Sequence, residues 1–346
     1  MSEFGRWLSS ECVSALQALS RNATENWWKE VLANPDLFLA LRGGYLNAYV
    51  KGQSIFKIGS ERGNGLDQDG APRVSIHYKY LVQPDLGKRD PYIWFDGQQF
   101  AVKPSDVVQT TYEPNITLPR LIKTASRFCG PEKAGVHEIA KNERKIIDLE
   151  IALSQSSDEG SSAPRMDLAV LIPNGPSHAS LVFCEAKCAD NVELWTLEKE
   201  KKNESGIRNL SIVAQIEKYK KYISNDRNRQ NLITSYVEVC KTLTNLHSQG
   251  WSRAPDPLIA RVAKEEVALS IHPHVYLLVY GYTAEQRDGE LGKQLDVLRA
   301  DDKLGKRIIA KGNATNFSLA QDIQRLVDAN SGKHASSTRP FANPSH

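Results

Sequence analysis

Two carboxylates and one ammonium lie in segments of the chain that are otherwise apolar. Glu185 and Lys187 are two residues apart in the segment 181–187, which favours a strand, so both side chains point to the same face. Asp167 lies in an earlier apolar segment, 166–172, which also favours a strand. Charged side chains in such surroundings are costly unless they are paired or bind something. If the two strands form a hairpin, Asp167 and Glu185 lie side by side.

This trio indicates metal-assisted chemistry on a phosphate. Two adjacent carboxylates repel each other unless a cation lies between them. Two carboxylates, with waters and a phosphate oxygen completing the shell, suit Mg²⁺. A lysine beside the metal can orient or deprotonate a water molecule and offset charge on a phosphorane-like transition state. The alternative is a strand whose charged residues simply face water, and the apolar neighbours argue against it.

A second motif follows on the next segment. Gln215 and Tyr219 are four residues apart in a segment expected to be helical, 209–223, so they share one helix face. Together with the aspartate and the E-x-K, this pair resembles the PD-(D/E)XK nuclease superfamily, in particular its RecB-like subgroup with a QxxxY motif. The resemblance covers about residues 131–283. The family's proline before the aspartate is absent, and Met166 stands in its place.

The resemblance implies a role for each motif residue. Asp167, Glu185 and the carbonyl of Ala186 would bind Mg²⁺, with Mn²⁺ as a substitute. Lys187 would position the attacking water. The helical pair would hold the lysine or the substrate phosphate; it consists of Gln215 and Tyr219.

The helix before the first strand often supplies a further acid in this family. Glu143 is slightly favoured for this role, because it is close to the strand. Glu138 and His137 are the alternatives on the same segment, and Glu150 on the strand is another. Each of them alone is also an ordinary solvated residue of its segment.

The implied function is a Mg²⁺-dependent nuclease, with DNA favoured over RNA, in prokaryotic defence, restriction or repair. One alternative is a non-catalytic nucleic-acid-binding or scaffold protein with a nuclease-like fold. Another is a subunit that is active only with a partner protein, and a homodimer is also possible from the sequence.

Nine basic and five acidic residues in 198–229 could track a phosphate backbone, or form a solvated helix face. Four aromatic residues could stack on bases, although core packing is favoured; they are Tyr78, Tyr80, Trp94 and Phe95.

Composition limits the class of protein. The 346 residues carry a net charge of +3, so a nucleic-acid surface would have to be a local patch. The five cysteines are scattered, which does not suit a secreted disulfide framework. The sequence shows neither a signal peptide nor an apolar stretch of about 20 residues that could span a membrane. We therefore expect a cytoplasmic protein without membrane association.

The fold expected from the elements is α/β. Residues 1–120 favour an N-terminal α+β unit for substrate or partner recognition, 121–330 a restriction-endonuclease-like core of a mixed sheet flanked by helices, and 331–346 a disordered tail. Alternation in 145–154 predicts Asp148 and Glu150 on a polar face. The other expected elements are two helices in 5–33, a hairpin at 45–58, a strand at 74–81, a second hairpin at 92–102, helices at 118–144 broken near Gly130, a loop at 155–163, a charged mobile segment at 198–205, a helix at 230–247, a strand at 274–283 and a helix at 318–329.

Overall fold

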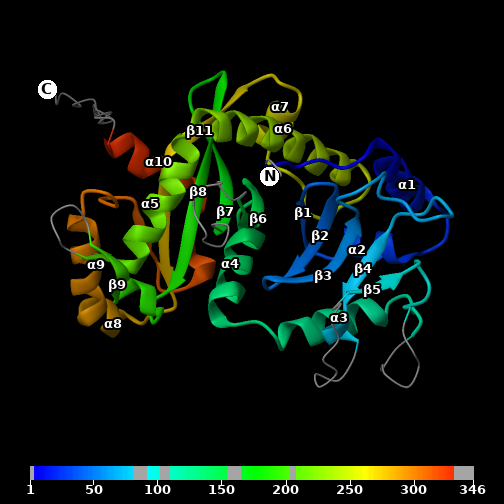
Figure 1. The fold of residues 1–346 in the computed structure, drawn as a ribbon, viewed down its shortest axis with the longest axis horizontal. Coiled ribbons are helices and arrows are strands. Elements are labelled where there is room, and N and C mark those ends of the chain that lie inside the picture. Colours follow the sequence, from blue (N-terminus) through cyan, green and yellow to red (C-terminus); the bar gives the residue numbers. More distant parts are fainter. Residues whose placement is uncertain (1–3, 82–91, 102–109, 154–164, 203–207, 331–346) are drawn as a thin grey trace, which may run out of the picture.

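The computed structural model describes residues 4–81, 92–101, 110–153, 165–202 and 208–330. Two five-stranded sheets lie side by side, and helices flank both of them (Figure 1). This arrangement confirms the α/β class. The loop expected at 155–163 and the tail expected at 331–346 lie outside the described residues.

The first sheet is antiparallel and its strands follow chain order from β1 to β5. The expected hairpin at 45–58 is confirmed, because β2 and β3 pair around a turn in which Lys51 and Gly52 both have positive φ. The strand expected at 74–81 ends early, since Tyr78–Tyr80 form a 3-10 turn, η1. The bounds are β1 Phe38–Leu41, β2 Tyr45–Val50, β3 Gln53–Gly59, β4 Val74–His77 and β5 Tyr92–Phe95.

Three helices accompany this sheet, and two of them are the pair expected in 5–33. Helix α3 packs against β2 and β3, although it straddles the expected boundary at residue 120. The second expected hairpin is confirmed over the described residues, because Phe95 pairs antiparallel with Phe100 and the Ala101 N–H donates to the Trp94 carbonyl at 2.9 Å. The helices are α1 Ser10–Arg21, α2 Trp27–Ala33 and α3 Thr117–Ser126.

The second sheet is mixed, with the strand order β12-β11-β8-β7-β6. Strands β6, β7 and β8 are antiparallel neighbours, whereas β11 runs parallel to both β8 and β12. A parallel neighbour requires a crossover, and helices α5 and α6 provide it between β8 and β11. The bounds are β6 Ile146–Ala152, β7 Arg165–Pro173, β8 His178–Cys188, β11 Ala268–Tyr280, β12 Ile308–Ala310, α5 Ser211–Ser224 and α6 Asp226–Ser248.

Helices cover both faces of this sheet. Phe183 of β8 packs in one core with Ile216 of α5, while Val182 packs in a second core with Val136 of α4 and Ile323 of α10. Strand β8 is therefore buried on both faces, which explains its apolar sequence. The remaining elements are α4 Pro131–Asn142, η3 Val192–Leu194, β9 Leu197–Lys202, β10 Arg208–Leu210, α7 Pro257–Ala263, α8 Ala284–Asp288, α9 Glu290–Ala300, η4 Ala314–Asn316 and α10 Leu319–Asn330.

The polar face predicted for 145–154 is wrong at Asp148. Its carboxylate is fully buried and accepts hydrogen bonds from Arg6 Nε at 3.1 Å, Arg42 Nη1 at 2.6 Å and the Tyr236 hydroxyl at 3.1 Å. Both faces of β6 are covered by packed residues, and the β6–β7 register also shifts between Ile146 and Asp148, which interrupts the alternation. Two arginines of the N-terminal part thus pair with an acid of the second sheet.

Candidate active site

Strands β7 and β8 separate where the predicted acids lie. Their last recorded pair is Leu168 with Cys184, and the same register continued by one residue sets Asp167 opposite Glu185. Opposite residues of an antiparallel pair share a face. The Ala186 N–H donates to Asp167 Oδ2 at 2.8 Å. The carboxylate of Asp167 thus occupies the gap where the two strands part.

Lys187 lies among three carboxylates. Its Nζ is 2.8 Å from Glu185 Oε1, 2.7 Å from Glu193 Oε2 and 3.8 Å from Glu132 Oε1. Glu185 and Lys187 are only 2% and 6% exposed, while Glu132 and Glu193 are partly open to solvent. The strand therefore holds a buried ion pair whose remaining positive charge is shared with acids from α4 and η3.

Helix α5 closes the group from the side of the crossover. Gln215 Nε2 donates to Glu185 Oε1 at 2.9 Å and to the Tyr219 hydroxyl at 2.7 Å. The Tyr219 hydroxyl donates to the carbonyl of Arg165 at the start of β7. The two side chains thus share a face that is turned toward the strands. The recorded contact of Gln215 in this group is with Glu185, and it does not reach the lysine directly.

Proton affinity in this group is set by burial and by like charges. Burial, followed by the neighbouring Glu185, raises the pKa of Asp167 well above its usual range, and the Ala186 N–H opposes this. Burial also raises the pKa of Glu185 to about 7, against the lowering effect of Lys187. Burial lowers the pKa of Lys187, but the carboxylates around it outweigh that effect and raise it overall.

Asp167 and Glu185 each have one carboxylate oxygen that accepts no hydrogen bond from the described residues. Glu185 Oε2 is buried and accepts no hydrogen bond from any described residue, whereas Oε1 is occupied by Lys187 and Gln215. No hydrogen bond within the described part of the chain uses Asp167 Oδ1. Two carboxylates that each leave an oxygen available suit a hard cation such as Mg²⁺. Across the described ranges, no cluster of three or more His, Cys, Asp or Glu side chains could hold a metal, so the backbone carbonyl of Ala186 and waters would have to complete the shell.

Glu143 is not part of this group. It ends α4, and its two carboxylate oxygens accept the backbone N–H groups of Lys145 and Ala320. The acid of α4 that does reach the group is Glu132, in the first turn of the helix. The sequence signal for it was the Gly130-Pro131 break, because a proline at the first helical position places the next residue at the open end of the helix.

Of the alternatives to Glu143, His137 and Glu138 lie outside the group, whereas the charge of Glu150 helps to raise the pKa of Asp167. His137 is buried, and its Nε2 is 3.0 Å from the carbonyl of Asp36. Glu138 follows it on α4 and makes no recorded contact with the group within the described residues. Glu150 forms an ion pair with Lys133 at 3.4 Å.

The aromatic candidates of the first sheet divide in two. Tyr80 and Phe95 are buried and belong to the core, which is the favoured interpretation. Trp94 is 45% exposed, and the Arg73 guanidinium lies over its ring at 3.7 Å from the centroid. Tyr78 is half-buried and stacks on His77.

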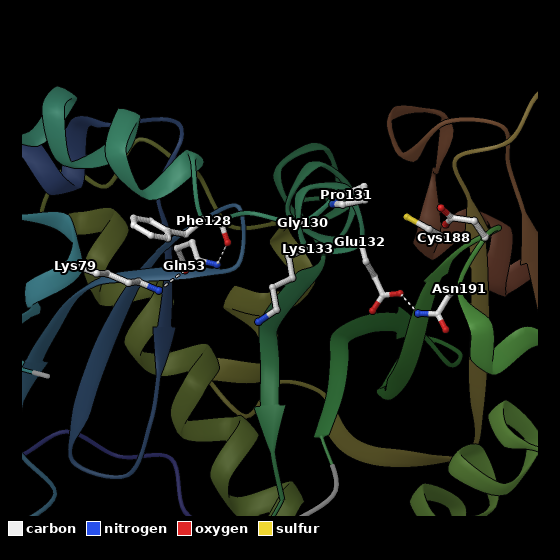
Figure 2. A pocket seen from close by; sticks show the side chains of 10 residues that line it. Gln53, Lys79, Phe128, Gly130, Pro131, Glu132, Lys133, Cys188 and Asn191 are labelled. Atoms are coloured by element: carbon white, nitrogen blue, oxygen red, sulfur yellow. Dashed lines mark hydrogen bonds between the residues drawn. The ribbon is translucent and has the colours of Figure 1, made fainter. Parts of the chain in front are cut away.

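A cleft of about 770 Å³ opens between the two sheets beside the acidic group. Gln53, Lys79 and Phe128 form the wall on the N-terminal side, and Glu132, Lys133 and Asn191 form the opposite wall (Figure 2). Asn191 Nδ2 donates to Glu132 Oε2 at 2.6 Å, across the end of the cleft. Glu132 therefore belongs both to the cleft and to the surroundings of Lys187.

Comparison with known proteins assigns no family to the chain, because no family model, curated protein or solved structure matches it. Among the described helices, none combines the length and the apolar character that a membrane crossing requires.

Proposed function

We propose that this protein is a Mg²⁺-dependent nuclease whose active site is built on Asp167, Glu185 and Lys187. The observation that carries the proposal is the buried, unpartnered Oε2 of Glu185 beside a second carboxylate. Such an oxygen is costly in the protein interior unless a cation or donor binds it. The order of elements supports the proposal, because a helix, three antiparallel strands, a helical crossover and a parallel strand follow one another, as the motifs lead us to expect.

The position of each residue in the group favours a particular role in the proposed reaction. Asp167, Glu185 and the Ala186 carbonyl would hold the ion, which when bound would supply charge stabilisation at the phosphate and acidify a water. Lys187 would orient the attacking water and offset the charge that develops on the phosphate.

The α5 pair would act by positioning. Gln215 binds the oxygen of Glu185 that faces Lys187, so it would leave the other oxygen to hold the ion. Tyr219 ties this arrangement to the first residue of β7 through the Arg165 carbonyl. These hydrogen bonds would fix the orientation of Glu185 and the position of the start of β7. The two carboxylates would thereby keep their positions relative to each other.

A cleavage assay on the full chain tests the proposal. Linear and circular DNA, both single- and double-stranded, and RNA are incubated with Mg²⁺, with Mn²⁺ and with EDTA. We expect cleavage of nucleic acid, DNA above RNA, that requires the divalent ion. Asp167→Asn should abolish it through loss of the metal, so high Mg²⁺ or Mn²⁺ should restore part of the activity.

Glu290→Asn is the matched control, because this acid is exposed on α9 and pairs only with Lys293 in the described residues. It should cleave like the wild type. The proposal fails if the wild type cleaves none of these substrates with any divalent ion. It also fails if pure Asp167→Asn protein cleaves at the wild-type rate in low Mg²⁺.

A further inference from the structure

The wall that the N-terminal part contributes to the cleft carries an ammonium, Lys79, that has no acidic partner among the described residues. Lys79 Nζ donates to the amide oxygen of Gln53 at 2.8 Å, and within the described residues no ion pair is recorded for it. It lies 5.0 Å from the centre of the Phe128 ring. Within the described ranges its charge is therefore held at the cleft by an amide and a ring, neither of which neutralises it.

A second ammonium faces it from the other wall. Burial, and then the charge of Lys133, lowers the pKa of Lys79. Lys133 forms an ion pair with Glu150 at 3.4 Å. Two ammonium groups that repel each other across a cleft are stabilised by an anion placed between them. Figure 2 shows both amines entering the space between the walls.

The same wall presents an aromatic ring to solvent. Phe128 is 39% exposed although its neighbours Lys79 and Tyr80 pack against it. Ammonium groups for phosphates next to a ring on which a base can stack are the pattern by which proteins bind single strands. In a duplex the base faces are covered by their neighbours, so an exposed ring has nothing to stack on.

The acids of the cleft lie at its other end. Glu132 and Asn191 are hydrogen-bonded to each other, and Glu132 Oε1 is 3.8 Å from Lys187 Nζ. The cleft thus carries an ammonium group on each wall, Lys79 and Lys133, and a carboxylate, Glu132, at the end beside the candidate active site.

We propose that this cleft binds single-stranded nucleic acid, with phosphates on Lys79 and Lys133 and a base on Phe128, and leads the strand to Lys187. The proposal rests on the proposed nuclease function, because only that function requires the nucleic acid to lead to Lys187. It specifies the substrate as single-stranded and not as a duplex. The N-terminal part would then form half of the substrate site.

Equilibrium binding in EDTA tests this independently of cleavage. Fluorescence anisotropy compares a labelled single-stranded DNA oligonucleotide with a blunt duplex of the same sequence at several salt concentrations. We expect at least ten-fold tighter binding of the single strand. Lys79→Gln and Lys133→Gln should each reduce the slope of log K against log salt by about 0.7, the contribution of one phosphate contact on a single strand.

Phe128→Ala should weaken binding of the single strand roughly ten-fold, within the range for loss of one stacked base. Phe128→Trp should restore it, because it keeps a ring. The control is Lys293→Gln, an exposed lysine on α9 that should leave both affinity and slope unchanged.

Equal affinity for the two DNA forms, no binding of either, or an unchanged slope in both lysine variants would overturn the inference. Cleavage by the wild type together with equal affinities would refute only this inference. Tight single-strand binding without cleavage under any divalent ion would refute only the nuclease function.

Discussion

Lys187 and Glu185 form an ion pair that the protein interior encloses almost completely. A lysine on a solvated strand would contribute little to stability or to chemistry. Here the ammonium also reaches Glu132 and Glu193, so one charge balances several acids. The pair is therefore sensitive to substitution, to pH and to added cations, and each of these can be tested separately.

Lys187→Ala is expected to lower the cleavage rate by at least about 10²–10³-fold. Loss of one group that stabilises developing charge typically has an effect of this size. Excess metal should not restore the rate, because the carboxylates remain. Rates at saturating DNA and calorimetry with Mg²⁺ measure the two effects, and circular dichroism verifies the fold. The exposed Lys293→Ala serves as the control. Wild-type cleavage by Lys187→Ala would place the active site elsewhere.

Stability should depend on pH through Glu185. Its pKa is raised to about 7 in the folded chain from an ordinary value of 4.5, so the folded state binds the proton more tightly than the unfolded state. The stabilisation from this proton is present below pH 4.5 and is lost as the pH rises through about 7. Divalent ions bind the ionised form of Glu185, so the stabilisation that they give should increase as the pH rises.

Thermal unfolding measures both trends at about pH 5.5 and about pH 8, values on either side of the folded pKa. The increase in Tm on adding Mg²⁺ should be larger at the higher pH. Glu185→Gln should lose most of that increase at both values, because its amide cannot ionise. An equal Mg²⁺ effect on wild type and variant would show that the ion binds away from Glu185.

At the scale of elements, helix α4 brings Glu132 to the group because it lies unusually close to the second sheet. A side-chain carbon at Gly135 would come within 2.1 Å of the Tyr280 ring on β11. Glycine at this position lets the helix approach, and the Tyr280 hydroxyl donates to the Glu132 carbonyl at 2.5 Å. The first turn of α4 is thereby anchored beside Lys187.

Gly135→Ala should destabilise the protein although alanine is the better helix former. Overpacking of a buried contact costs about 1–3 kcal/mol, against roughly 1 kcal/mol gained from helix propensity. Cleavage should fall as well, because Glu132 moves with the helix. Urea unfolding and the cleavage assay read out the two effects. Gly130→Ala is the control, since a carbon there meets nothing within 4 Å; equal stabilities of the two variants would refute the close-approach argument.

At the scale of the whole molecule, the two sheets share one continuous core. Apolar residues of both parts, such as Phe56 on β3 and Phe183 on β8, belong to the same cluster. Asp148 adds a polar link, because its buried carboxylate joins Arg6 and Arg42 to the second sheet. The N-terminal part is thus packed into the body of the protein.

Asp148→Ala is expected to lower the free energy of unfolding by about 3–5 kcal/mol, because it leaves two buried guanidinium groups without their carboxylate. Glu61→Ala, which breaks an exposed pair with Lys57, should change it by only about 0–1 kcal/mol. Urea denaturation gives both values. A loss in Asp148→Ala no greater than in the control would mean that the guanidinium groups reach water.

Deletion of residues 1–120 is expected to unfold the remaining chain. An independent unit would leave residues 121–330 folded and able to bind metal, but the shared core and the arginines on Asp148 lead us to the opposite result. Far-ultraviolet circular dichroism and a urea titration of the truncated protein test this. A cooperative unfolding transition in the truncated protein would restore the view of two independent domains.

The sequence by itself was sufficient to predict the contacts that local geometry governs. The two-residue period of a strand put Glu185 and Lys187 on one face, a short connection made β7 and β8 a hairpin, and helical spacing aligned Gln215 with Tyr219. Tertiary structure alone decided that Glu132, and not Glu143, joins the group, because the direction in which α4 packs chooses between its two ends. The burial of Asp148 likewise depends on a strand irregularity and on partners more than a hundred residues away, Arg6 and Arg42. No periodicity in the chain encodes such contacts, because they arise only when separate elements pack together.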